Sequence, residues 1–277
     1  MGSSLNGKTL FMSGGSRGIG LAIAIRAARD GANVCLIAKT DEPDPRLPGT
    51  IHTAAAEIEA AGGQALPILG DVRGEQDVLV AVERCLERFG GIDICVNNAS
   101  AINLSGTLEL PMKRYDLMQD INTRGTFVVS KTCIPHLREA ANPHVLTLSP
   151  PLNIQPKWFG RHVAYTISKF GMSMCTLGMS EEFRSDGIAF NSLWPRTLIA
   201  TAAVQNLVGG DRAMKSSRRP EIMADAARAI FERPSRECTG NFFIDEQVLA
   251  AEGITDLSPY RYRDDVSEAD LIPDLYV

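Results

Sequence analysis

The chain has 277 residues, a formal net charge of −5, a hydrophobic fraction of 44% and a charged fraction of 22%. This length suffices for one large α/β domain, and the composition is that of an ordinary globular protein. The acidic balance argues against a nucleic-acid partner, and no apolar run is long enough to span a membrane.

The predicted elements alternate between short apolar runs and longer helical patterns. The first half is predicted to run strand 8–12, helix 18–29, strand 33–38, helix 50–61, strand 64–69, helix 75–89 and strand 92–96. The second half is predicted to run helix 113–139, strand 144–148, helix 162–185, strand 188–194, helix 220–231 and strand 241–244. Such alternation predicts α/β architecture: a single Rossmann-type, doubly wound parallel sheet with helices on both faces.

Two stretches lie outside this alternation. Residues 40–49 contain three prolines, which predict a loop after the second strand. The tail 251–277 shows no strong periodicity, and we expect it to pack on the domain 1–250 or on a neighbouring subunit.

Cysteine and histidine patterns give little sign of a special site. The six cysteines form no C-x-x-C pair, and the four histidines lack metal-ligand spacing. We therefore expect buried free thiols, no disulfide framework and no metal. The N-terminus lacks the apolar segment of a signal peptide, so the expected location is cytoplasmic.

A glycine-rich loop follows the first strand and precedes a helix. Its proposed cofactor-binding residues are Ser13, Gly14, Ser16, Arg17, Gly18, Ile19 and Gly20. Glycines let the backbone approach a pyrophosphate, and the helix N-terminus offers free N–H groups and a positive dipole to it. The spacing differs from G-x-G-x-x-G, and an ordinary glycine-rich turn is the alternative.

The end of the second strand indicates which dinucleotide is bound. NAD sites usually carry an acidic residue there, whereas this chain has Lys39, with Arg17 in the preceding loop. Two cations without an acid favour a 2′-phosphate and hence NADP(H). The alternative is that Lys39 simply faces solvent.

The third and fourth strands end in further polar residues. Asp71, followed by Val72, is placed to accept a hydrogen bond from the adenine amino group. Asn98 and Ala99 are placed to hold the adenosine side and to brace the mouth of the sheet.

Tyr165 and Lys169 are four residues apart in a helical pattern, so both lie on one helix face. A neighbouring ammonium stabilises a phenolate, so the pair can transfer a proton to or from a carbonyl or alcohol oxygen. Taken alone, the spacing is common and is compatible with surface pairing.

These motifs, in this order, resemble the short-chain dehydrogenase/reductase family over nearly the whole chain. Within the family the chain is most similar to the hydroxysteroid dehydrogenase-like proteins. The segments that carry the resemblance include SRGIG, GGIDICVNNASAI, INTRGTF, AYTISKFGMSM and SLWPRT. Longer members of that group add a C-terminal sterol-carrier domain. This chain ends before such a domain, so lipid transfer is not expected of it.

The resemblance implies particular roles. Tyr165 would be the general acid/base, and Lys169 would lower the Tyr165 pKa and bind the nicotinamide ribose. Asn122 would hold a water in a proton relay to Lys169. The backbone at Pro195 would contact the nicotinamide amide, with Thr197 on the amide or the pyrophosphate. The family also implies a homodimer or homotetramer through the helices 113–139 and 162–185.

Two positions depart from the family pattern. Its catalytic serine aligns with Pro150, one residue after Ser149. Ser149 then either replaces that serine in catalysis or is simply a turn residue at the strand end. In the second case, either another hydrogen-bond donor replaces the serine or the activity on typical substrates is low. The usual Pro-Gly after the sixth strand is Pro195-Arg196 here. Arg196 either binds an anionic substrate group or faces solvent.

The substrate pocket is expected to be apolar, with Leu152, Trp158 and Phe159 in its lining and His162 facing it or serving as a structural residue. Together these features predict an NADP(H)-dependent oxidoreductase acting on a carbonyl or secondary alcohol of a steroid-, lipid- or acyl-like substrate. Two alternatives are an NADP(H)-binding sensor or scaffold with little turnover, and an enzyme of the same fold with non-redox chemistry.

Overall fold

A computed structural model describes residues 5–44 and 49–277, and its centre is a seven-stranded parallel sheet. The strands are β1 (Thr9–Ser13), β2 (Asn33–Ala38), β3 (Gln64–Leu69), β4 (Ile94–Asn97), β5 (His144–Thr147), β6 (Ala189–Trp194) and β7 (Phe242–Ile244). Their order across the sheet is β3-β2-β1-β4-β5-β6-β7. The predicted doubly wound α/β architecture is confirmed.

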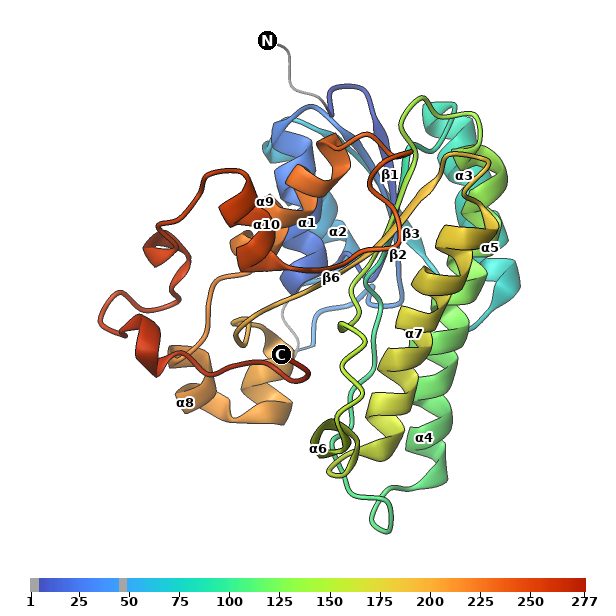
Figure 1. Cartoon of the computed structure of the whole chain (residues 1–277). Coiled ribbons are helices and arrows are strands. Elements are labelled where there is room, and N and C mark those ends of the chain that lie inside the picture. The colour runs from blue at the N-terminus through green and yellow to red at the C-terminus, as the bar shows by residue number, and fades with distance from the viewer. Residues whose placement is uncertain (1–4, 45–48) are drawn as a thin grey trace.

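Helices cover both faces of this sheet (Figure 1). They are α1 (Gly18–Arg29), α2 (Ile51–Ala60), α3 (Glu75–Phe89), α4 (Met112–Met118), α5 (Gly125–Leu137), α6 (Pro156–Phe159), α7 (Val163–Glu182), α8 (Gly210–Lys215), α9 (Glu221–Glu232) and α10 (Asp245–Ala251). One apolar core lies under α1, α9 and α10 and includes Ile23, Ile230 and Val248. The other lies under α3, α5 and α7 and includes Val82 and Cys133.

The chain reverses its winding direction between β1 and β4. It runs outward from β1 through β2 to β3, then returns to place β4 on the other side of β1. Ser13 at the end of β1 pairs in register with Asn97 at the end of β4. In sheets of this kind, the crevice beyond such a switch point is where ligands bind.

The single helix predicted over 113–139 is interrupted by a π-helical turn, η1 (Gln119–Arg124), between α4 and α5. The helices α6, α8 and α10 and a second π-helical turn, η2 (Val204–Val208), were not predicted from the sequence. The helix α10 follows β7 without an intervening loop, so no turn signal marks its start.

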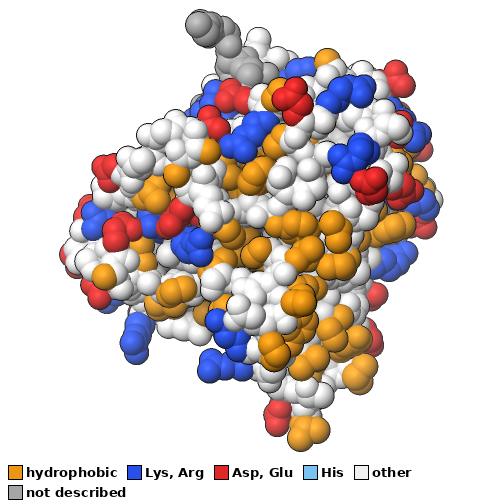
Figure 2. All heavy atoms as spheres, in the orientation of Figure 1, with side chains coloured by type: hydrophobic (Ala, Val, Ile, Leu, Met, Phe, Trp, Pro, Cys, Tyr) orange, Lys and Arg blue, Asp and Glu red, His pale blue; other side chains and the backbone are white. Residues whose placement is uncertain are grey.

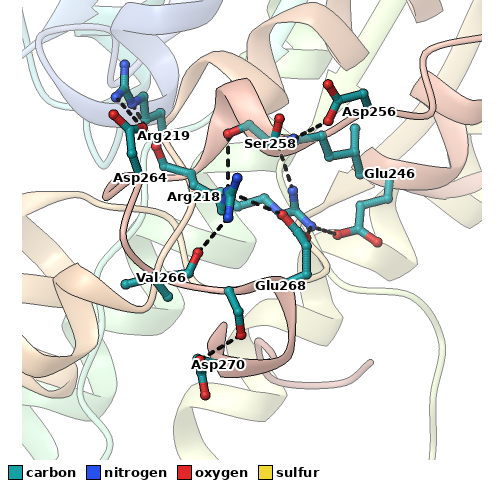
Figure 3. A network of polar contacts seen from close by, with 12 residues as sticks. Arg218, Arg219, Glu246, Asp256, Ser258, Asp264, Val266, Glu268 and Asp270 are labelled. Carbon is teal, nitrogen blue, oxygen red and sulfur yellow. Dashed lines mark hydrogen bonds and ion pairs between the residues drawn. The ribbon is translucent and has the colours of Figure 1, made fainter.

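The tail beyond α10 is folded onto the domain. Arg218 is buried, with only 3% of its surface exposed. It donates hydrogen bonds to the Leu257 carbonyl and to the carboxylates of Glu246 and Glu268. Figure 3 shows this network joining α10 and two segments of the tail.

The cysteines are free, and five of the six are buried, as predicted. Over residues 5–44 and 49–277, no group of His, Cys, Asp or Glu side chains is arranged to hold a metal ion. Within the same ranges, none of the helices is both long and apolar enough to cross a membrane.

Candidate active site

The glycine loop is held tightly against the end of β4. Gly14 has a φ of +73°, and a Cβ there would lie 2.7 Å from the Cα of Ala99. The Asn98 amide donates a 2.7 Å hydrogen bond to the Gly14 carbonyl, and a Cβ on Gly20 would lie 2.5 Å from that amide nitrogen. Only glycine fits at positions 14 and 20, so these two residues allow the loop to lie this close to the end of β4.

Ser13 completes the same brace from β1. Its hydroxyl accepts hydrogen bonds from the backbone N–H groups of Asn98 and Ala99 and donates to the Val96 carbonyl. Ser16 is buried in the loop, and Ile19 packs on the core beneath α1. The sequence-predicted residues of both strand ends are therefore brought together.

The N-terminus of α1 opens onto this crevice. Its N-cap residue, Arg17, is extended and makes no side-chain capping bond, so the first N–H groups of the helix lack an internal partner. Thr201 lies beside Gly18, with its methyl group 3.3 Å from where a Cβ of Gly18 would be. Unsatisfied amides and a positive dipole at such an end fit the pyrophosphate of a dinucleotide.

Three charged side chains surround the end of β2. Lys39 is exposed. Arg17 donates to the Gly49 carbonyl at 2.6 Å, and its Nε is buried with no partner among the described residues. Burial lowers the pKa of Arg17, against the attraction of Asp44. Part of the Arg17 guanidinium is thus engaged by the loop that follows β2.

Asp71 is engaged by a neighbour. Both of its carboxylate oxygens accept hydrogen bonds from Arg73, from the guanidinium and from the backbone N–H. Burial tends to raise the Asp71 pKa, but Arg73, together with the charge of Lys39, outweighs it and lowers the pKa. Val72, the next residue, is buried under the sheet.

Tyr165 and Lys169 lie on α7 and are both buried. The Lys169 ammonium donates a 2.6 Å hydrogen bond to the Leu148 carbonyl, and it lies 5.2 Å from the centre of the Trp194 ring. Burial lowers the Lys169 pKa to about 7, although Asp274 opposes this. Such an ammonium is poised to change its charge near neutral pH.

The Tyr165 phenol has a pKa well above its ordinary value because burial disfavours the phenolate, with Tyr276 and Asp274 adding to the effect. The lowered pKa that the resemblance implied is therefore not seen in this arrangement. The physical reason is that desolvation of the phenolate dominates, while the Lys169 ammonium is bonded to a backbone carbonyl.

Asn122 lies in the π-helical turn η1 and is fully buried. Its side chain accepts from the Ala101 N–H at 2.7 Å, and donates to the Ala101 carbonyl and to the Ser168 hydroxyl at 2.9 Å each. Ser168 in turn donates to the Tyr165 carbonyl. Asn122 thus ties the loop after β4 to the helix turn that carries Tyr165 and Lys169.

Ser149 follows β5 and points into the interior. Its hydroxyl lies 2.7 Å from that of Ser192 on β6, which also donates to Thr176 on α7. The residue is completely buried. The adjacent Pro150 carbonyl accepts a hydrogen bond from Ser173. Of the alternatives for Ser149, this geometry favours the turn residue at the strand end.

The predicted pocket residues do gather around Tyr165. Leu152, Trp158 and Phe159 are partly buried in one apolar cluster with Tyr165 and Trp194. His162 precedes α7, with its ring centre 6.4 Å from that of Tyr165. Its Nε2 is buried without a partner in the described part of the chain, and burial lowers its pKa.

The segment after β6 borders this cluster. Pro195 and Thr197 are buried, and the Thr197 hydroxyl has no partner among the described residues. Arg196 is partly exposed, and its backbone N–H donates to the Asp245 carboxylate. Trp194 at the end of β6 belongs to the apolar cluster and Thr201 lies beside Gly18, so this part of the chain borders both the cluster and the glycine loop.

The structure adds two residues that sequence reasoning missed. Tyr276 is fully buried in the same cluster as Tyr165, and the backbone N–H of Asp274 donates to the Arg196 carbonyl after β6. Both belong to the aperiodic tail, so no local pattern marks them.

Comparison with known proteins agrees with this geometry. The family model described as short chain dehydrogenase matches residues 8–210. Hydroxysteroid dehydrogenase-like protein 2 of Danio rerio is 61% identical over 256 residues, which are 92% of this chain and 61% of that protein. The chain thus spans about three fifths of the length of this curated relative.

Two solved structures extend the comparison. A short chain dehydrogenase from Mycobacterium thermoresistibile is 59% identical, with a TM-score of 0.93 over 99% of this chain and 96% of that one. An NADH-dependent reductase, A1-R′, solved with NAD, is 27% identical, with a TM-score of 0.70 over 88% of this chain and 97% of that one. The chain belongs to the short-chain dehydrogenase family of oxidoreductases, and the resemblance to the hydroxysteroid dehydrogenase-like proteins is confirmed.

Proposed function

We propose that this chain is an NADP(H)-dependent oxidoreductase that interconverts a carbonyl and a secondary alcohol on an apolar substrate of steroid, lipid or acyl type. The observation that carries the proposal is the meeting, at one sheet edge, of three features. These are the uncapped N-terminus of α1, the buried Tyr165–Lys169 pair and an aromatic wall that includes Trp158.

The chemistry divides between cofactor and protein. When bound, the nicotinamide supplies or accepts the hydride. The Tyr165 hydroxyl donates a proton to the substrate oxygen in reduction and becomes a phenolate, and in oxidation the phenolate accepts the proton of the alcohol. Lys169 balances the phenolate charge with its ammonium. Asn122 holds the turn that carries both residues, and Ser149 remains a bonded strand-end residue in this scheme.

The cofactor preference rests on the end of β2. The exposed Lys39 ammonium lies near the Asp71 carboxylate, and Arg17 comes from the adjoining loop. A carboxylate at position 39 would repel a 2′-phosphate, whereas an ammonium attracts it. Adenosine contacts are assigned to Asp71, Val72, Asn98 and Ala99, and nicotinamide contacts to Pro195 and Thr197.

Replacing Lys39 with aspartate tests this preference. We expect K39D to weaken NADPH binding about tenfold or more, the equivalent of ~1.4 kcal/mol, while NADH binding is kept or improved. Fluorescence titration with each cofactor measures both dissociation constants. Lys113→Asp, a change of the same charge at an exposed position of α4, is the matched control and should leave the ratio unchanged. Equal losses for NADPH and NADH in K39D would contradict the assignment.

Turnover itself is tested with a panel of ketones, aldehydes and acyl thioesters, followed by loss of NADPH absorbance. On any substrate found, Tyr165→Phe should lower kcat/KM at least ~100-fold and leave NADPH binding intact, because the phenol supplies only the proton. Tyr262→Phe, at a 42% exposed tyrosine in the tail, is the control. NADPH binding without turnover of any panel member would instead support a sensor or scaffold.

The assembly is proposed to be a homodimer or homotetramer, placed in the cytoplasm. Apolar side chains of α5 and α7 are exposed, among them Phe127 at 50%, Ile167 at 44% and Met174 at 47%. Figure 2 shows hydrophobic side chains gathered over the region of α6 and α7. A contiguous apolar surface of this kind is typical of an interface.

A further inference from the structure

The position at which the family carries its catalytic serine offers no free hydrogen-bond donor in this chain. Pro150 has no donor of its own, and its carbonyl accepts a hydrogen bond from the Ser173 hydroxyl at 2.7 Å. The Ser149 hydroxyl is completely buried and is paired with that of Ser192 at 2.7 Å. A donor that polarises a substrate carbonyl must therefore come from another residue.

The nearest hydroxyl groups on α7 are also engaged. The Thr166 hydroxyl donates to the Trp158 carbonyl at 3.1 Å and lies 3.1 Å from the hydroxyl of Tyr276. The Ser168 hydroxyl donates to the Tyr165 carbonyl at 2.8 Å. Both side chains hold the framework of the site together, so neither is free to bind a substrate oxygen.

His162 stands beside the phenol of Tyr165. It is the N-cap residue of α7, one helical turn before Tyr165, and the two ring centres are 6.4 Å apart with their planes inclined at 58°. The His162 carbonyl accepts a hydrogen bond from the Thr166 N–H at 3.0 Å, which fixes this first turn of the helix. The imidazole is therefore held next to the group that transfers the proton.

The Nε2 atom of His162 is buried and has no hydrogen-bond partner among the described residues, although only 8% of the residue is exposed. The indole N–H of Trp158, in the apolar cluster around Tyr165, is a second such atom. Leaving buried polar atoms unpaired costs free energy, and in folded proteins such atoms usually meet water or a ligand. Few polar groups in an apolar lining are typical of a site that orients an apolar ligand by its oxygen.

The charge state of His162 suits a hydrogen-bond donor. Burial lowers the His162 pKa, and the positive charge of Arg161 lowers it further. The imidazole is therefore mostly neutral at pH 7 and carries a single N–H. A neutral imidazole can polarise a carbonyl group by hydrogen bonding while it keeps its own proton.

We propose that His162 is a catalytic residue of this site, whose Nε2–H donates a hydrogen bond to the substrate carbonyl oxygen in place of the family's serine. The proposal rests on the proposed function, because that function assigns carbonyl chemistry to Tyr165. The hydrogen bond stabilises the negative charge that develops on the oxygen during reduction, and Tyr165 still delivers the proton. His162 keeps its own proton, so the atoms and charges of the reaction are unchanged.

The first test shows which ring nitrogen of His162 carries the proton, and it needs no substrate. Long-range ¹H–¹⁵N NMR spectra of the full chain with ¹⁵N-labelled histidine separate the two neutral tautomers. The His162 signals are assigned by their disappearance in His162→Gln. We expect the proton on Nε2 at pH 7.5. A proton on Nδ1 would overturn the proposal, because Nε2 would then have nothing to donate.

The second test uses any ketone that the unsubstituted chain reduces with NADPH. His162→Phe keeps an aromatic ring but removes the donor, and should lower kcat/KM at least ~100-fold, mainly through kcat. His162→Gln keeps an N–H of similar reach and should recover at least ~10-fold of that loss. The NADPH dissociation constant and the melting temperature should stay unchanged in both. His136→Phe, at a partly exposed histidine of α5, is the matched control.

Unchanged kcat/KM in His162→Phe would overturn the proposal and leave the proposed function standing. Equal losses of activity in His162→Phe and His162→Gln, with a lowered melting temperature in both, would also overturn it, because His162 would then be a structural residue only. Absence of turnover in the unsubstituted chain would instead sink the proposed function, and the catalytic role of His162 with it.

Discussion

At the scale of single residues, His144 shows how burial sets the charge of a side chain outside the active site. It begins β5 and is 1% exposed, and its Nε2 lies 3.0 Å from the Arg233 carbonyl, to which it donates. Its Nδ1 is buried without a partner in the described part of the chain. Protonation would add a second N–H with no acceptor, so burial lowers the His144 pKa to about 4.

This shift predicts an acid-sensitive fold. The unfolded chain binds a proton at His144 near pH 6.5 and the folded chain only near pH 4, so stability from this residue is present above pH 6.5 and is lost as the pH falls towards 4. The loss should approach about 3 kcal/mol. Urea unfolding of His144→Gln at several pH values should show a shallower acid slope than the unsubstituted chain. His136→Gln, at a partly exposed histidine of α5, should show the original slope.

The hydrogen-bond partners of two predicted site residues could not be predicted from the sequence. Lys169 and Ser149 were recognisable by spacing and position, but their hydrogen-bond partners, Leu148 and Ser192, depend on how β5 and β6 lie against α7. A motif identifies a side chain and not the groups that surround it.

At the scale of elements, two glycines that lie in helices differ in whether the surrounding structure leaves room for a side chain. A Cβ on Gly20 of α1 would lie 2.5 Å from the Asn98 amide and 2.7 Å from the Gly14 carbonyl. A Cβ on Gly178 of α7 would meet no atom of the described residues within 4 Å. Both glycines carry the same cost in helix propensity, so their substitutions differ only in packing.

We therefore expect opposite effects from the two alanine substitutions. Gly20→Ala should push Asn98 from the glycine loop, lower the free energy of unfolding by ~1–3 kcal/mol and weaken NADPH binding. Gly178→Ala should raise the free energy of unfolding by up to ~1 kcal/mol and leave binding unchanged. Denaturant unfolding and fluorescence titration of both variants measure this. A neutral Gly20→Ala would mean that the brace between Gly14 and Asn98 is dispensable.

The boundaries of helices and strands were predictable where a turn residue ends the hydrophobic pattern. The bounds of α1, β2, β3 and α3 coincide with those predicted, because each is an amphipathic or doubly apolar run closed by a turn residue. The π-helical turn η1 could not be predicted, because it lies inside one continuous helical pattern. It matters because Asn122 belongs to it, and π-helical turns often occur at functional sites.

At the scale of the whole molecule, the tail is held by long-range contacts. The guanidinium of Arg218 joins Glu246 of α10 to Glu268, as Figure 3 shows. It also donates to the Leu257 carbonyl. Beyond this network the chain continues to its last residues, of which Leu275, Tyr276 and Val277 pack in one apolar cluster with Tyr165. A tail with no periodic pattern thereby becomes a wall of the candidate active site.

The sequence by itself determined the alternation of strands and helices, the parallel sheet, the glycine loop and the Tyr165–Lys169 pair. These follow from local patterns, since hydrophobic periodicity and glycine positions act within a few residues. Only the tertiary structure decided the partners of Ser149, the burial of Lys169 and the approach of Asp274 and Tyr276. Tyr276 lies 110 residues from Thr166 along the chain, and the contact between their hydroxyls arises from packing, which no local pattern encodes.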